Sequence, residues 1–228
     1  MYKKMESRFK MITRITFLVL VSIFSGVALA DTNETITITF QIDDDNRTPV
    51  SDAVIILTPT DGDYPEVSVD NLPTAVMNQI DKQFAPHVLV VQKNTEIAFP
   101  NADNLFHHVY SFSPTKQFEL KLYKEFTAEP LLFEQSGIVD IGCNIHDWML
   151  GYIVVSDSPY FLKTDNDGTG QVTVPKGEYE MQLWHPALSY VEAFDDKVAS
   201  FTTSQTMSVS LDETVPEQQG FDDGFGDY

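Results

Sequence analysis

Apolar and polar residues alternate along most of the chain from residue 35 onward, in short runs separated by turn residues. The clearest run spans residues 35–42, where Ile36, Ile38, Phe40 and Ile42 alternate with threonine and glutamine. This two-residue period is typical of a half-buried strand. Further strands are predicted at residues 53–57, 87–91, 96–99, 106–112, 118–123, 137–143, 151–155, 171–174, 179–184 and 206–211. Many short strands with regular turns between them predict an all-β fold, built as a sandwich or a barrel.

Three segments depart from this pattern. Residues 60–75 contain Pro65, Pro73 and an Asp-Gly-Asp sequence, which predict a long loop or linker. Residues 76–84 are predicted to form a short helix. Residues 213–228 are rich in glycine and acidic residues and are predicted to be a disordered tail.

The first 30 residues have the composition of a secretory signal peptide. Five basic residues precede an apolar run at residues 15–24, and Ala28-Leu29-Ala30 provides a small-residue cleavage site. The apolar run is short for a membrane span, which needs about 20 residues. We therefore expect export with cleavage after residue 30 and no membrane span in the mature chain. The alternative is that the segment stays uncleaved as an anchor.

The chain is strongly acidic. Its 228 residues include 14 basic and 34 acidic ones, a formal net charge of −20. Loss of residues 1–30 removes five basic residues and one acidic residue, which moves the net charge to −24. Binding to nucleic acid is therefore not expected, because its affinity depends on Lys and Arg at the phosphates. Such a charge attracts basic protein partners, although adaptation to a salty environment would produce the same composition.

The candidate chemistry lies in Cys143-Asn144-Ile145-His146-Asp147-Trp148-Met149, where a cysteine, a histidine and a methionine follow one another at intervals of three. Thiolate, imidazole and thioether are soft ligands that select copper or zinc over calcium or magnesium. Two histidines and a cysteine with a weak axial methionine form a blue-copper site, so a second histidine is needed. His107 and His108 are the candidates. Because successive side chains of a strand face opposite ways, only one of them is expected to reach the ion.

Other kinds of site fit these residues less well. Structural zinc normally has four nitrogen or sulfur ligands, and methionine is a poor one. A thiol hydrolase needs a base oriented by a third group and an oxyanion hole, and no such pieces are visible in the sequence. The remaining alternative is structural: Cys143 and Met149 buried in a core, with His146 on the surface. Cys143 is the only cysteine, and an exported free cysteine favours burial, metal binding or pairing between chains.

Residues 86–155 resemble a cupredoxin, the small Greek-key sandwich of plastocyanin, amicyanin and azurin. The spacing from Cys143 through His146 to Met149 is that of amicyanin, and the segment from Asn101 to Val109 is similar to the one that supplies amicyanin's first ligand. The resemblance implies a mononuclear type 1 copper bound by His107, Cys143, His146 and Met149. His108 then stands where cupredoxins carry an asparagine, so His108 and Asn144 are expected to orient the ligand segments from a second shell.

A wider resemblance covers nearly all of the mature chain. Residues 107–114, 143–149 and 183–186 recur in bacterial cupredoxin-like proteins known as methylamine-utilisation proteins. Residues 46–54, 165–168 and 174–179 resemble strands of the transthyretin-type, carboxypeptidase-regulatory-like sandwich. The implied organisation is a signal peptide at 1–30, a discontinuous regulatory-like sandwich at 31–75 and 158–212, a cupredoxin domain inserted at 76–157, and the tail at 213–228. The alternative is an N-terminal extension packed on the cupredoxin.

These observations predict a periplasmic blue-copper protein that transfers single electrons. A basic redox partner such as a cytochrome or a dehydrogenase is expected, with Ile145 and Trp148 forming an apolar docking patch around His146. The chain is expected to be a carrier and not an enzyme. It has five histidines, and a multicopper oxidase needs many more. The alternatives are a copper carrier or sensor without redox cycling, and a structural sandwich with a vestigial metal site.

Overall fold

The computed structural model describes residues 34–62, 72–124, 129–188, 192–212 and 214–215. Every helix or strand assigned in these ranges is a β-strand, so the predicted all-β fold is confirmed. The same residues contain no helix that is long and apolar enough to cross a membrane. The predicted signal peptide at 1–30 and most of the predicted tail at 213–228 lie outside the described residues, as do residues 63–71 of the predicted linker.

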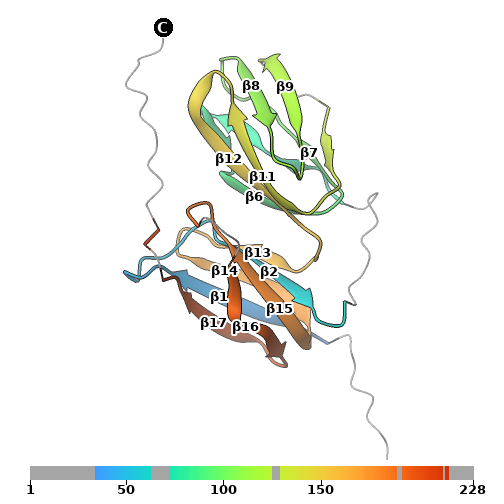
Figure 1. Ribbon diagram of the computed structural model, residues 1–228, viewed down its shortest axis with the longest axis vertical. Coiled ribbons are helices and arrows are strands. Elements are labelled where there is room, and N and C mark those ends of the chain that lie inside the picture. Colours follow the sequence, from blue (N-terminus) through green and yellow to red (C-terminus); the bar gives the residue numbers. More distant parts are fainter. Residues whose placement is uncertain (1–33, 63–71, 125–128, 189–191, 213, 216–228) are drawn as a thin grey trace, which may run out of the picture. The chain divides into compact units, whose positions relative to one another are not determined.

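Strands from the two ends of the described chain form two sheets, which we call the flanking sandwich (Figure 1). One sheet has the order β14–β1–β17 and the other the order β13–β2–β15–β16. The bounds are β1 Thr35–Asp43, β2 Val54–Pro59, β13 Phe161–Lys163, β14 Thr169–Pro175, β15 Gly177–Trp184, β16 Glu192–Phe201 and β17 Gln205–Ser210. Ile36, Ile38, Phe40 and Ile42 are buried, as the alternation along β1 predicts, and they pack in one apolar core with residues of the second sheet.

The strands between these form the central sandwich, which contains the candidate residues. Its larger sheet has the order β6–β12–β11–β8–β9, and it lies with a sheet of order β10–β7–β3 and a β4–β5 hairpin. The bounds are β3 Ala75–Val76, β4 Asn78–Ile80, β5 Gln83–Ala85, β6 Val88–Gln92, β7 Thr95–Ala98, β8 His107–Ser111, β9 Phe118–Tyr123, β10 Leu131–Phe133, β11 Gly137–Cys143 and β12 His146–Ser156. Ile97, Val139, Ile141 and Ile153 belong to its core.

The helix predicted at residues 76–84 is wrong. The segment forms β3, β4 and β5, and Ile80 pairs with Gln83 across a two-residue turn. The φ angles in this turn are 53° at Asp81 and 56° at Lys82. Positive φ at both central residues is what a type I′ hairpin turn requires. Turn geometry therefore overrides the helical spacing of Met77 and Phe84, both of which are buried.

The candidate ligand segment is a tight turn that leads directly into a strand. β11 ends at Cys143 and β12 begins at His146, and these two residues pair with each other across Asn144 and Ile145. The strand predicted at residues 151–155 is therefore the second half of the longer β12. The register shifts between Gly142 and Cys143, as expected for a bulge that turns a side chain to a new direction next to a functional site.

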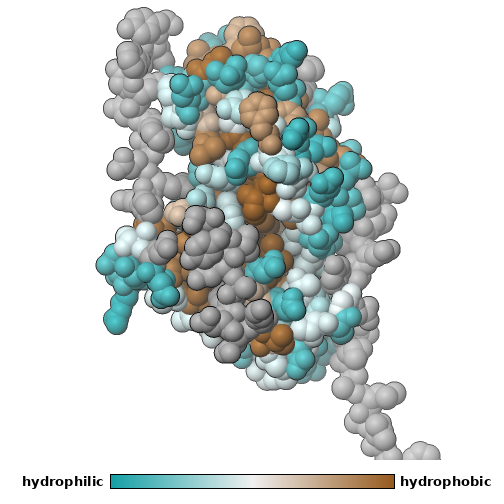
Figure 2. Space-filling model, in the orientation of Figure 1, coloured by the Kyte–Doolittle hydropathy of each residue, from teal (hydrophilic) through white to brown (hydrophobic). Residues whose placement is uncertain are grey.

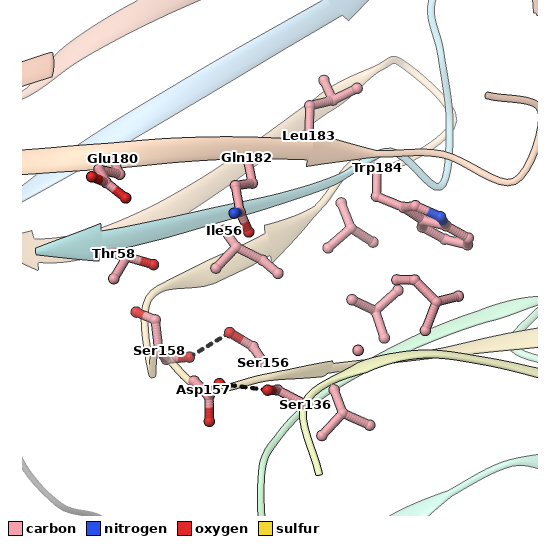
Figure 3. Close-up of a pocket in the computed structure, with 15 residues that line it drawn as sticks. Ile56, Thr58, Ser136, Ser156, Asp157, Ser158, Glu180, Gln182, Leu183 and Trp184 are labelled. Carbon is pink, nitrogen blue, oxygen red and sulfur yellow. Dashed lines mark hydrogen bonds between the residues drawn. The ribbon is translucent and has the colours of Figure 1, made fainter. Parts of the chain in front are cut away.

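Strands of both sandwiches contribute to one small buried cluster. Val54 of β2 and Trp184 of β15 pack with Val88 of β6 and Val154 of β12. A hollow of about 520 Å³ lies beside this cluster, lined by residues of β2, β11, β12 and β15 (Figure 3). Residues 32–228 form one compact unit, and the domain boundaries expected near residues 75 and 157 stay predictions.

Candidate metal centre

Cys143 lies at the end of β11, on the face of the strand that packs in the central core. Val139, Ile141 and Cys143 alternate along β11 and are all buried, as side chains two residues apart share a face. The thiol is free. The strand therefore delivers a single sulfur atom to the edge of a hydrophobic core.

Three donor atoms converge at this edge. Cys143 Sγ lies 3.7 Å from His107 Nδ1 and 3.6 Å from His146 Nδ1, and the two nitrogen atoms are 3.2 Å apart. In a trigonal site with bonds of about 2.0–2.1 Å to nitrogen and about 2.3 Å to sulfur, the donors would stand about 3.5–3.8 Å apart. The three side chains therefore fit around one metal ion with little movement.

Burial and hydrogen bonding shape the protonation of this group. Burial raises the pKa of the Cys143 thiol, but hydrogen bonds from His107 and from backbone N–H groups outweigh it, so the pKa lies below its usual value. Burial lowers the pKa of His107, but hydrogen bonds with Cys143 and Asp103 outweigh it, and that pKa lies above its usual value. A thiol with a lowered pKa gives up its proton more readily, as a thiolate ligand must.

Asp103 holds the far side of the His107 ring. Its Oδ2 lies 2.8 Å from His107 Nε2, and its carboxylate also accepts hydrogen bonds from the backbone N–H of Asp81, at 2.7 Å, and of Lys82, at 2.9 Å. A carboxylate at one ring nitrogen fixes the tautomer and leaves the other nitrogen available to a metal. Asp103 therefore ties the first histidine to the β4–β5 turn.

Asn101 shapes the segment that carries Asp103. Its amide nitrogen donates to the carbonyl oxygens of Leu105 and Tyr123, both at 2.9 Å, and its Oδ1 accepts from the backbone N–H of Asp103 at 2.9 Å. Asp103 is absent from the site predicted by sequence. The signal that could have found it is a carboxylate four residues before a candidate histidine, in a segment leading into a strand.

The structure separates the two neighbouring histidines. The His107 side chain is fully buried at the three donors, whereas His108 points to the opposite face of β8, where its Nε2 lies 2.9 Å from Glu119 Oε1. The two expected orienting residues contact each other through the backbone, because the Asn144 N–H donates to the His108 carbonyl oxygen at 2.9 Å.

Met149 does not join the three donors, so its predicted ligand role is corrected: its sulfur lies too far away to share their ion. In the pairing with β11, the partner positions pass from Leu150 directly to His146, so regular strand alternation does not run from His146 to Met149. The Met149 side chain is buried in the central core, which is the packing role that methionine has in many proteins.

Apolar residues lie close in the chain to the two candidate histidine ligands, and one of them contacts the partly exposed His146. Its ring lies 5.5 Å from that of Trp148, centroid to centroid, and Ile145 in the turn is 45% exposed. Phe106, which precedes His107, is 54% exposed. Large exposed apolar patches are typical of contact surfaces, and the docking patch of Ile145 and Trp148 stays a prediction. In Figure 2, brown apolar patches lie among teal polar residues on the visible face of the molecule.

Comparison with known proteins gives likenesses to solved copper proteins. No family model and no curated protein matches the chain. The chain is similar to the copper-containing nitrite reductase of Thermus scotoductus SA-01, with 19% identity and a TM-score of 0.36 over 38% of this chain and 23% of that one. It is also similar to a reduced Cu(I) form of an amicyanin mutant, with 19% identity and a TM-score of 0.33 over 45% of this chain and 98% of that one.

An oxidised amicyanin mutant gives the same values: 19% identity and a TM-score of 0.33 over 45% of this chain and 98% of that one. At this level the likenesses carry no argument about function. They also give no support to the methylamine-utilisation family or to the regulatory-like flanking module, which stay predictions. The case for a function therefore rests on the geometry of the three donors.

Proposed function

We propose that this chain transfers single electrons through one type 1 copper ion held by His107, Cys143 and His146. The observation that carries the proposal is the convergence of one sulfur and two imidazole nitrogens within 4.8 Å of one another. A thiolate with two imidazoles is the ligand set of blue-copper electron-transfer sites. When bound, the copper supplies a centre that alternates between two oxidation states one electron apart.

The residues around the donors have separate tasks in this proposal. Asp103 holds the His107 ring in place, so the site keeps its shape in both oxidation states. The buried Cys143 and His107 exclude water from one side. His146 lies at the partly exposed edge, next to Trp148, and is where an electron enters or leaves.

Export and partner belong to the same proposal. The signal-peptide pattern of residues 1–30 supports a periplasmic location, and the net charge of −20 supports a basic redox partner such as a cytochrome or a dehydrogenase. We propose that the chain is a carrier that exchanges electrons with such a protein and not an enzyme with a substrate of its own.

Copper loading of the purified protein tests the proposal. We expect one copper per chain, an intense visible charge-transfer band that bleaches reversibly on reduction, and loss of the band in Cys143→Ala. His107→Ala is expected to abolish the band and His108→Ala to retain it, since only His107 faces the thiol. Loss of the band in His108→Ala with retention in His107→Ala would contradict the assignment.

A carrier of Cu(I) is the second candidate. Met149 lies outside the donor group, so a three-coordinate site is left, and soft thiolate ligands also select Cu(I). A colourless copper-loaded protein that stays reduced in air would favour this candidate. Failure to retain copper in stoichiometric amount would leave the structural interpretation, in which the site is vestigial.

A further inference from the structure

The outer face of the central sandwich carries a pocket next to the donors. It has a volume of about 490 Å³ and is lined chiefly by His108, Tyr110, Phe112, Phe118, Glu119 and Asn144; we call it the β8–β9 pocket. Tyr110 pairs directly with Glu119 across the two strands, so both side chains stand on the same face. His108 lies two residues before Tyr110 and shares that face.

The lining combines aromatic surface with a carboxylate. The rings of Tyr110 and Phe112 lie 5.0 Å apart, centroid to centroid, and Phe112 is 79% exposed, the highest value among the large apolar side chains that the structure describes. The Glu119 side chain is 52% exposed while it bonds to His108, so its carboxylate has room for a further donor. Aromatic faces beside a carboxylate are the environment that binds an organic cation.

The pocket is one residue away from the thiol. Asn144 follows Cys143 in the chain and donates its backbone N–H to the His108 carbonyl oxygen at 2.9 Å. The Tyr110 hydroxyl covers Gly142, the residue before Cys143: a Cβ atom there would stand 3.0 Å from this oxygen. A group bound in the pocket therefore lies against Asn144 and against Tyr110, whose hydroxyl covers Gly142.

We propose that the β8–β9 pocket accepts an arginine side chain of the redox partner. This inference rests on the proposed electron transfer and names a contact that would make recognition of the redox partner specific. A guanidinium group stacks flat on aromatic rings and presents a fork of donors to a carboxylate, whereas the ammonium of lysine is a compact, strongly hydrated charge. The acidic chain attracts any basic protein, and this pocket selects and orients one side chain of it.

Titration of the copper-loaded, reduced protein tests the contact itself. The probe is N-acetyl-arginine methylamide, with the uncharged citrulline analogue as control, and the readout is the amide NMR shifts of His108, Tyr110 and Asn144. We expect saturable shifts with the arginine probe and none with the citrulline probe. Binding is expected to weaken about two- to fivefold in Phe112→Ala, in the range of an exposed cation–π contact. Equal shifts with both probes, or shifts unaltered in Phe112→Ala, would overturn the proposal.

Electron-transfer kinetics test whether the β8–β9 pocket contributes to the reaction with a redox partner. A reduced, basic c-type cytochrome is mixed with the Cu(II) protein at low ionic strength, and each rate constant is divided by that for ascorbate with the same variant. Glu119→Gln is expected to lower this ratio about three- to tenfold, because charges at a contact act mainly on association. Glu96→Gln, the same charge change at an exposed position of β7, is expected to lower it less than about twofold. Equal effects of the two variants would mean diffuse attraction and overturn the proposal.

Failure of the pocket proposal can be distinguished from failure of the proposed function. If the wild-type protein accepts electrons from the cytochrome but Glu119→Gln and Phe112→Ala react like it, the pocket proposal is wrong and the proposed function stands. If the protein neither retains copper nor accepts electrons, the proposed function is wrong, and the pocket as a partner contact fails with it.

Discussion

The two sandwiches differ in the polar groups that they bury. In the flanking sandwich, the buried hydroxyls of Thr164 and Ser158 donate to backbone carbonyl oxygens at 2.7 and 2.5 Å. The central sandwich buries Gln79 and His107, and Gln79 Oε1 lacks a hydrogen-bond partner among the described residues. An unsatisfied buried polar atom costs about 1–3 kcal/mol. The flanking sandwich therefore uses these hydroxyls to close the fold, whereas the central sandwich also buries an imidazole whose Nδ1 faces a thiol.

The largest loss of stability is expected from a substitution in the flanking core, which contains none of the three donors. Phe40 is fully buried in the flanking core, and Phe40→Ala should lower the free energy of unfolding by about 3–5 kcal/mol. Chemical denaturation measures this loss. Copper stoichiometry and the visible band of the folded fraction should stay unchanged, because Phe40 belongs to the other core. A shift of the visible band in this variant would contradict the view that the flanking core does not influence the metal site.

Substitution of Asp103 is expected to act chiefly on the affinity for the metal. Asp103→Ala removes the carboxylate that holds the His107 ring, and loss of such an outer partner typically costs about 10–100-fold in metal affinity. Competition with a copper chelator measures the affinity. The matched control is Asp157→Ala, which removes an exposed carboxylate that pairs with Lys93 at 3.1 Å. Equal affinities of the two variants would show that the contact between Asp103 and His107 does not position the ring.

Met149 should matter chiefly to packing. Met149→Leu conserves volume in the central core and should change the free energy of unfolding by less than about 1.5 kcal/mol. Copper should be retained in stoichiometric amount with its visible band, since the three converging donors are untouched. Loss of copper in this variant would show that the sulfur of Met149 reaches the ion after all.

The smallest effect concerns pH. Burial lowers the pKa of the His185 imidazole below its usual value, against the attraction of Asp52. In the unfolded chain this imidazole takes up a proton near pH 6.5, whereas in the folded chain it does so only at lower pH. Its contribution to the free energy of unfolding is therefore complete above about pH 6.5 and is lost as the pH falls. The copper-free His185→Asn variant should therefore lose less stability than wild type between about pH 7.5 and about pH 5.5. Parallel denaturation series at both pH values test this, and equal losses would contradict it.

Local patterns predicted much of the fold and less of the site. The alternation along residues 35–42 predicted β1, and the strand predicted at residues 137–143 is β11. The helix at 76–84 failed because positive φ at Asp81 and Lys82 makes a hairpin that the spacing does not reveal. The strands β10, β13 and β16 were not predicted. Of these, β10 and β13 are only three residues long and too short to show a period.

The site depends on contacts between segments far apart in the sequence. Spacing alone indicated Cys143 and His146 as candidates. Strand alternation predicted that only one of His107 and His108 reaches the site, and the family resemblance selected His107. The role of Asp103 arises because a turn at residues 81–82 folds against the segment before β8. Met149 is buried in the central core, which the spacing of the candidate ligands does not reveal.

X-ray absorption at the copper edge of the loaded wild-type protein tests the central claim most directly. The proposed site predicts one copper with one short sulfur bond and two imidazole nitrogens, and loss of that sulfur in Cys143→Ser. A copper coordinated without a short sulfur bond, or with a second sulfur donor equally close, would contradict it.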